Sequence, residues 1–215
     1  FNTHGADRLP AVLRRRCHVI LQSCPAREPL RKTDRRLRVL MVGHLREEKD
    51  PLTYLRAARR LVDRADVRFE HVGEVLDPVL GREVQALAAS HPRFRWFGSL
   101  PHAQVRRRIQ CAHVLVHASR LEGGAHVVSE ALRSGTPVIA SRIDGNLGLL
   151  GDDWPATFAV GDDAALAALL AAARDDPAVL ADLRRRATER ASLFDPQVER
   201  EALLRVVAGL LDRAS

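Results

Sequence analysis

Short hydrophobic runs alternate with segments of helical periodicity over most of this chain. The runs are rich in β-branched and aromatic residues and are too short for ordinary helices, so each predicts a buried strand. We expect six strands, at residues 39–43, 67–73, 93–98, 113–118, 137–141 and 156–160.

The segments between the runs carry helix signals. Asp-Pro pairs at residues 50–51, 176–177 and 195–196 predict helix starts, with the aspartate as N-cap and the proline as first helical residue. Helices are expected at residues 51–63, 78–91, 101–111, 125–135, 164–174, 178–193 and 196–213. Residues 144–146 follow the fifth strand and either border a binding site or form a plain turn, of which the turn is favoured. Strands alternating with helices predict an α/β fold, a doubly wound (Rossmann-like) parallel sheet.

The two ends of the chain fit this alternation poorly. Residues 18–22 predict one isolated strand, and a linker rich in proline and arginine follows it up to residue 36. We therefore divide the chain into a remnant of another domain with its linker (1–36), a Rossmann-like domain (37–195) and a terminal helix (196–215). Since the chain opens on Phe1 rather than methionine, we expect a fragment of a longer protein.

Composition narrows the class of protein. Hydrophobic residues make up 46% of the chain, enough for a sizeable core, and no apolar run reaches the ~18 residues of a membrane span. No secretory signal opens the sequence. Cys17, Cys24 and Cys111 have no metal-ligand spacing, so we expect free thiols in a reducing cytoplasm.

The net charge of +7 raises the question of a nucleic-acid partner. Nearly all of the positive charge is arginine, scattered over predicted helix faces among acidic residues, and aromatic residues are only 4% of the chain. Nucleic-acid binding favours clustered basic residues with interleaved aromatics. We therefore interpret the arginines as a solvated surface and expect no nucleic-acid partner.

Two loops are expected to meet at one edge of the sheet. In a doubly wound sheet the first and fourth strands commonly lie side by side, and ligands bind beyond their carboxyl ends. This places Gly43–Asp50 opposite Ser119–Ala125. Arg46 and Lys49 in the first loop complement a diphosphate. The glycine turn and the helix start in the second loop suit an anion.

Two carboxylates, Glu122 and Glu130, bracket that glycine turn. Carboxylates accept hydrogen bonds from hydroxyl groups, and an anion with several hydroxyls describes a nucleotide sugar. Neither loop has a dinucleotide-binding or P-loop spacing. Taken singly, Lys49 is equally well explained as an exposed lysine at a helix start. Glu130 alone is explained as a surface glutamate of a helix. The two loops together are a more specific signal than either residue.

At these residues the chain resembles the retaining GT4 glycosyltransferases of the GT-B fold. Their signature, two glutamates separated by seven residues, is matched by Glu122 and Glu130 within 122–138. Their G-R-L-x-x-x-K-G loop is matched by Gly43, Leu45 and Lys49. In place of the usual arginine stands His44, so either Arg46 substitutes for it or His44 contacts phosphate. Gly-Ala at residues 124–125 replaces the usual Phe-Gly.

A narrower resemblance is to the selenosugar synthases of selenoneine biosynthesis. It rests on residues 43–51, 119–125, 140–146 and 148–151, with a weaker match at 19–23. Such enzymes join selenophosphate to the sugar of a UDP-sugar, typically UDP-N-acetylglucosamine. The alternatives that remain are a generic GT4 hexosyltransferase acting on a glycan or lipid, and a non-catalytic nucleotide-sugar binding module.

The resemblance implies roles for individual residues. Glu130 binds the ribose hydroxyls and Glu122 lies near the transferred sugar. Arg46 and Lys49 neutralise the leaving diphosphate, and no metal or other cofactor is required. The predicted donor-binding residues are Gly43, His44, Gly123, Gly124, Val128, Ser129 and Glu130. The base is expected near residues 98–100.

The resemblance also implies how this chain relates to a complete enzyme. In the GT-B fold the acceptor side belongs to an N-terminal domain, most of which this chain lacks. We therefore expect the chain to bind a nucleotide sugar without transferring it. The last helix either crosses back to the N-terminal domain or packs on its own domain. No stable membrane insertion is expected.

Overall fold

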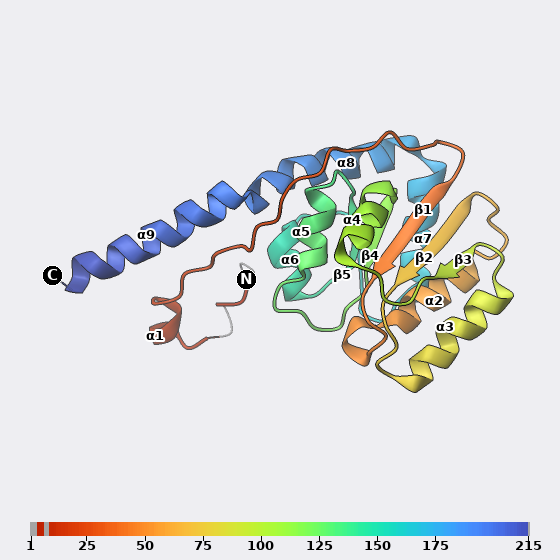
Figure 1. The fold of residues 1–215 in the computed structure, drawn as a ribbon, viewed down its shortest axis with the longest axis horizontal. Coiled ribbons are helices and arrows are strands. Elements are labelled where there is room, and N and C mark those ends of the chain that lie inside the picture. The colour runs from red at the N-terminus through yellow and green to blue at the C-terminus, as the bar shows by residue number, and fades with distance from the viewer. Residues whose placement is uncertain (1–3, 7–8, 215) are drawn as a thin grey trace.

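A six-stranded parallel sheet forms the centre of the computed structural model, which describes residues 4–6 and 9–214 (Figure 1). The strand order is β3-β2-β1-β4-β5-β6. The strands are β1 (Leu37–Val42), β2 (Val67–Val72), β3 (Phe94–Trp96), β4 (Val114–His117), β5 (Val138–Ser141) and β6 (Thr157–Phe158). All neighbouring pairs are parallel, so the predicted α/β doubly wound sheet is confirmed.

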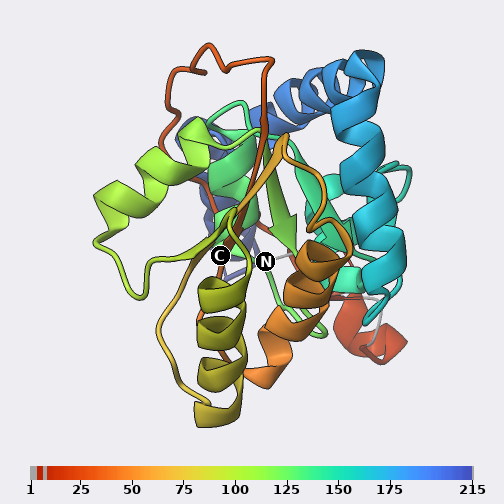
Figure 2. The same ribbon diagram turned by 90° about the vertical axis from the view of Figure 1, so that its right-hand side faces the viewer.

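Helices cover both faces of the sheet. α2, α3 and α7 pack together on one side, and α4, α5 and α6 are grouped on the other (Figure 2). The helices are α1 (Ala11–Arg14), α2 (Pro51–Arg60), α3 (Pro78–Ser90), α4 (His102–Cys111), α5 (His126–Leu132), α6 (Asp144–Leu150), α7 (Asp163–Asp175), α8 (Pro177–Ala191) and α9 (Pro196–Ala214), with short 3₁₀ helices η1 (Glu47–Lys49) and η2 (Ser192–Phe194). Because both faces are covered, the central strands β1 and β4 are almost wholly buried and read as continuous apolar runs.

Three local predictions were wrong. Residues 18–22 form no strand. Residues 144–150 form α6 rather than a plain turn, although Gly145 and Gly148 lower its helix propensity. Asp50 precedes α2 but does not cap it through its side chain. Its backbone is left-handed, with φ 45°, and its carboxylate accepts a hydrogen bond from Thr53 Oγ1 at 2.7 Å. The other two Asp-Pro aspartates do cap, Asp176 binding the Ala178 amide and Asp195 the Gln197 amide.

An irregular segment, residues 23–33, runs along the outside of the domain, and we call it the strap. The Cys24 amide donates to the Phe194 carbonyl and the Arg27 amide to the Arg133 carbonyl. Further along, the Gln110 side chain donates to the Glu28 carbonyl. The strap therefore ties η2, α5 and α4 together before β1 begins.

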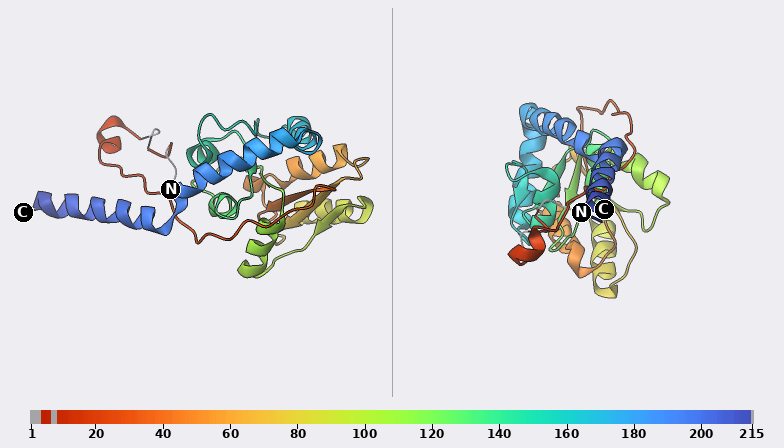
Figure 3. Two further views of the ribbon diagram at one scale, coloured as in Figure 1. Left: turned by 90° about the horizontal axis from the view of Figure 1, so that it is seen from above. Right: turned by 90° about the vertical axis from the view of Figure 1, so that its left-hand side faces the viewer.

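α9 leaves the body of the molecule after its first turns (Figures 1 and 3). Large apolar side chains along it are exposed, namely Val198, Leu203, Leu204, Val207, Leu210 and Leu211. Packing of this helix on its own domain, one of the two expected alternatives, is therefore not observed. Within the part of the chain that the structure describes, no helix combines the length and hydrophobicity needed to cross a bilayer.

Candidate nucleotide-sugar site

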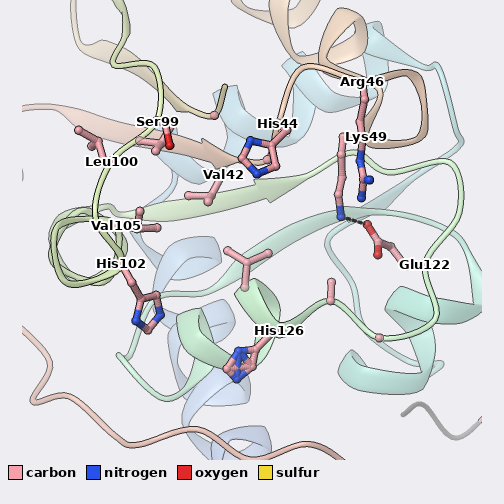
Figure 4. Close-up of a pocket in the computed structure, with 16 residues that line it drawn as sticks. Val42, His44, Arg46, Lys49, Ser99, Leu100, His102, Val105, Glu122 and His126 are labelled. Carbon is pink, nitrogen blue, oxygen red and sulfur yellow. Dashed lines mark hydrogen bonds and ion pairs between the residues drawn. The ribbon is translucent and has the colours of Figure 1, made fainter. Parts of the chain in front are cut away.

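A cavity of about 460 Å³ lies beyond the carboxyl ends of β1 and β4 (Figure 4). β1 pairs directly with β4, as the sequence predicted. The two loops that follow these strands therefore meet, and both line the cavity. Of the predicted site residues, Gly43, His44, Arg46, Lys49, Glu122 and Gly124 contribute to its wall. Gly123, Val128, Ser129 and Glu130 do not.

The first loop is held in place by Leu45. This side chain is fully buried, and its amide donates to the Glu74 carbonyl at 2.8 Å. The neighbouring side chains are thereby turned outward into the cavity. His44 Nδ1 accepts a hydrogen bond from the Glu74 amide at 3.1 Å, so the neutral ring carries its proton on Nε2 and can donate it to an anion. Arg46 is nearly half exposed, with Glu48 as a distant partner at 3.9 Å.

Lys49, from the first loop, and Glu122, from the second, form an ion pair at one side of the cavity. Glu122 also accepts a hydrogen bond from Ser119 Oγ at 2.7 Å and lies 3.5 Å from His117 Nε2. Burial alone would raise the pKa of Glu122, but its contacts with His117, Lys49 and Ser119 outweigh burial and lower that pKa to about 2. Glu122 is therefore a fixed negative charge at neutral pH.

His117 and Asn146 support the site in a way that sequence reasoning missed, although residues 144–146 were one candidate for its border. Asn146 Nδ2 donates to the Ser141 carbonyl at 2.8 Å, which turns its Oδ1 toward His117 Nδ1 at 2.8 Å. The His117 ring is thus oriented with Nε2 toward Glu122. His117 is a buried, hydrogen-bonded histidine of β4, and the sequence pattern does not show that it supports Glu122. Its place at the carboxyl end of the fourth strand, five residues before Glu122, is the signal that could have found it.

Two glycines allow backbone segments to approach at the site. A Cβ on Gly73 would lie 1.8 Å from the Gly43 carbonyl oxygen, and a Cβ on Gly145 would lie 2.2 Å from that of Glu122. Any larger residue would push the β1 loop or the β4 loop out of position. These glycines therefore set the width of the cavity.

The loop between β3 and α4, together with the start of α4, supplies the third wall. The residues that line the cavity here are Ser99 and Leu100 of the loop and His102 and Val105 of α4. The base was expected near residues 98–100, and two of these three residues do face the cavity. Leu100 and Val105 give this side an apolar surface.

Glu130 lies behind the wall instead of in it. Its side chain is only 6% exposed, and its Oε1 lies 2.6 Å from His102 Nε2 and 3.6 Å from Arg106 Nη1. Val128 and Ser129 are buried in the same helix; the Val128 amide donates to the Ala125 carbonyl and Ser129 Oγ to the His126 carbonyl. The start of α5, from Gly124 to Val127, does line the cavity.

The fold is similar to that of several solved structures. A TarM mutant of S. aureus, in complex with fondaparinux, α-GlcNAc-glycerol and UDP, is 15% identical with a TM-score of 0.73, over 86% of this chain and 38% of that one. Anabaena Alr3699/HepE, in complex with UDP and glucose, is 18% identical with a TM-score of 0.69, over 81% and 48%. Sucrose-phosphate synthase of Thermosynechococcus elongatus is 26% identical with a TM-score of 0.69, over 85% and 47%.

This chain thus spans less than half the length of each of these proteins. The similarity supplies the fold, a Rossmann-like half of a GT-B glycosyltransferase. A family model described as glycosyl transferases group 1 matches residues 25–193, which include both loops of the cavity. The chain belongs to the group 1 glycosyl transferases.

Proposed function

We propose that the cavity binds the donor of a glycosyl transfer, a nucleotide sugar, and that the complete protein transfers its sugar. The observation that carries the proposal is the Lys49–Glu122 pair, which places a cation and a fixed carboxylate on one wall of the cavity. Beside it His44 and Arg46 add donors for phosphate oxygens. Preorganised donors around a leaving diphosphate supply the main electrostatic contribution to glycosyl transfer, so no metal ion is required in this proposal.

The donor that we propose is a UDP-sugar, most specifically UDP-N-acetylglucosamine. UDP is bound in two of the similar structures, TarM and HepE. The resemblance of the two cavity loops to selenosugar synthases supports the same donor. Glu130 is assigned to the ribose hydroxyls and Glu122 to the vicinity of the transferred sugar. The amides of Gly123–Gly124 are assigned to sugar and phosphate, whereas Val128 and Ser129, buried in α5 outside the cavity wall, are not.

The acceptor that we propose is selenophosphate, and the product is a selenosugar of selenoneine biosynthesis. This assignment rests on the resemblance of residues 43–51, 119–125 and 140–146 to the selenosugar synthases. A generic hexosyltransferase with a glycan or lipid acceptor is the second candidate, and the 26% identity with sucrose-phosphate synthase favours it. Comparing selenophosphate with sugar acceptors in the complete protein separates the two.

Calorimetric titration of the chain with UDP, UDP-N-acetylglucosamine, GDP and ADP tests the donor site. We expect UDP and its sugar to bind and to raise the melting temperature. Glu130→Ala is expected to weaken binding by about 1–3 kcal/mol, the range for a lost hydrogen bond to a charged group. A preference for GDP or ADP would leave the glycosyltransferase assignment standing and would overturn the selenosugar assignment. Unchanged affinity in Glu130→Ala would contradict the role of Glu130.

The transfer step is proposed to need the rest of the enzyme, because the acceptor side of a GT-B enzyme belongs to its N-terminal domain. We propose that the exposed apolar side chains of α9 contact that domain. The chain alone is expected to bind UDP-N-acetylglucosamine without forming product from it and selenophosphate. Product formation by the isolated chain, followed by mass spectrometry, would refute this division of labour.

A further inference from the structure

Glu130 is close to the cavity, but two histidines stand between them. His102, at the start of α4, and His126, at the start of α5, both line the cavity (Figure 4). Behind them the Glu130 carboxylate is 2.6 Å from His102 Nε2 and 3.8 Å from His126 Nδ1. A ligand in the cavity therefore reaches Glu130 only past these rings.

Of the groups around this carboxylate, His102 is the one free to move. Arg106 is 4% exposed and is fixed by a hydrogen bond to the Pro25 carbonyl at 2.8 Å. His126 is 40% exposed and contacts the Ser23 carbonyl at 3.3 Å. The His102 side chain is 73% exposed, and its ring is hydrogen-bonded to Glu130. Rotation of His102 thus costs one hydrogen bond and disturbs no packing.

We propose that His102 is a displaceable gate over Glu130, which swings away when the ribose hydroxyls of a nucleotide take its place on the carboxylate. The inference rests on the proposed function and deepens it. In the empty site the ring keeps a nearly buried carboxylate hydrogen-bonded, since an unpaired one would be costly. On binding, two hydroxyl donors replace the single imidazole donor.

The gate makes the site selective for ribonucleotides. A ligand with vicinal hydroxyls recovers the hydrogen bond that the departing ring gives up. A ligand without vicinal hydroxyls cannot replace His102 on the carboxylate. If the ring moves away, the Glu130 carboxylate loses this hydrogen bond and gains none. A site that must hydrogen-bond a hydroxyl rejects the analogue that lacks it. His102 is thus a specificity-determining residue, while Arg106 holds the carboxylate in place.

Calorimetric titration of the chain with UDP and with 2′,3′-dideoxyuridine diphosphate tests the gate. His102→Ala is expected to bind UDP about two- to fivefold more tightly, the range for removing a competing solvent-exposed ion pair. The dideoxy nucleotide should show no such gain. His102→Gln, which can still donate to Glu130, should fall between Ala and the parent chain. His18→Ala, a change of another exposed histidine, is the matched control.

A double-mutant cycle shows whether the effect passes through the carboxylate. In the Glu130→Gln background, His102→Ala should no longer alter UDP affinity. Weaker or unchanged UDP binding in His102→Ala would overturn the gate, because it would mean that the ring contacts the ligand or plays no part. If UDP fails to bind every variant and the parent chain alike, the proposed donor itself is wrong, and the gate falls with it.

Discussion

Glu122 shows how strongly a single residue in this site depends on its neighbours. Three side chains from three directions, Lys49, Ser119 and His117, converge on one carboxylate that is 12% exposed. Any one of them is an ordinary side chain. Together they keep the carboxylate ionised at pH values well below those at which a glutamate is ordinarily protonated. The folded protein therefore carries this negative charge whether or not a ligand is bound.

This arrangement predicts a pH-dependent contribution to stability. The folded pKa of Glu122, about 2, lies below the ordinary value of 4.5. The ionised carboxylate therefore stabilises the fold fully above pH 4.5, and this stabilisation is lost as the pH falls toward 2. Glu122→Gln is expected to lower the free energy of unfolding by about 2–3 kcal/mol at pH 7 and by progressively less below pH 4.5. Denaturant unfolding at pH 7, 4.5 and 3 measures the difference.

The matched control is Glu47→Gln, an exposed glutamate of the facing loop after β1, which should leave stability unchanged at each pH. If the parent chain and Glu122→Gln keep a constant difference from pH 7 to 3, the carboxylate is not held by these partners.

Sequence reasoning placed some residues of the site correctly and missed others for a physical reason. Strand order alone brings Lys49 and Glu122 to one edge of the sheet, because parallel strands end together. Strand order does not determine the direction in which a helical side chain points. The sequence pattern therefore does not show that Glu130 lies behind His102. Nor does it show that His117 reaches Glu122, since that depends on how Asn146 orients the ring.

At the scale of elements, close backbone approach at Gly73 joins the end of β2 to the loop after β1. A Cβ there would lie 1.8 Å from the Gly43 oxygen, and backbone atoms cannot yield as a side chain can. Gly73→Ala is expected to destabilise the fold by about 1–3 kcal/mol, as overpacking does, and to weaken UDP binding by moving the His44 loop.

Thermal unfolding and calorimetry measure the two effects of Gly73→Ala. Gly123→Ala, where a Cβ meets no atom within 4 Å, should keep the stability of the parent chain. An unaltered melting temperature in Gly73→Ala would show that the two loops are not in contact.

The element boundaries were predictable where local signals and packing agree. Asp176 and Asp195 cap their helices as expected. α6 was missed because Gly145 and Gly148 argue against a helix locally, while in the fold the absence of a Cβ at Gly145 lets α6 pack directly on the Glu122 loop. Tertiary packing here overrides propensity. The strand expected at residues 18–22 is not formed, and this segment pairs with none of the six strands of the sheet.

At the scale of the whole molecule, buried histidines make the fold sensitive to mild acid. Burial lowers the pKa of His71 and of His113 to about 4, although each ring is hydrogen-bonded to a backbone carbonyl. The unfolded chain therefore takes up protons first as the pH falls from 6.5 to 4, and the free energy of unfolding decreases over that range.

The slope of the unfolding free energy against pH gives the number of protons directly. Near pH 5 we expect about two more protons in the unfolded state than in the folded state from His71 and His113. Denaturant unfolding between pH 7 and 4 measures it. A flat curve would mean that these rings are already protonated in the fold.

α9 is expected to contribute little to the stability of the domain. Beyond Glu199 its large apolar side chains are exposed. Removing residues 202–215 should change the free energy of unfolding by less than about 0.5 kcal/mol, the usual range for surface changes, and should reduce self-association of the chain. Chemical denaturation and sedimentation velocity measure both; a marked loss of stability would show that the helix does pack on the body.

The strap gives the molecule a mechanical property. Ser23 donates through its amide and hydroxyl to the Glu199 carboxylate, so the N-terminal segment and α9 leave the body at one point. A force that pulls the two ends apart acts first on this contact. The hydrogen bonds of residues 24–33 to the body of the domain then break one after another, before the force reaches β1. The sheet and its cavity are thereby shielded from strain applied at the N-terminal end of the chain.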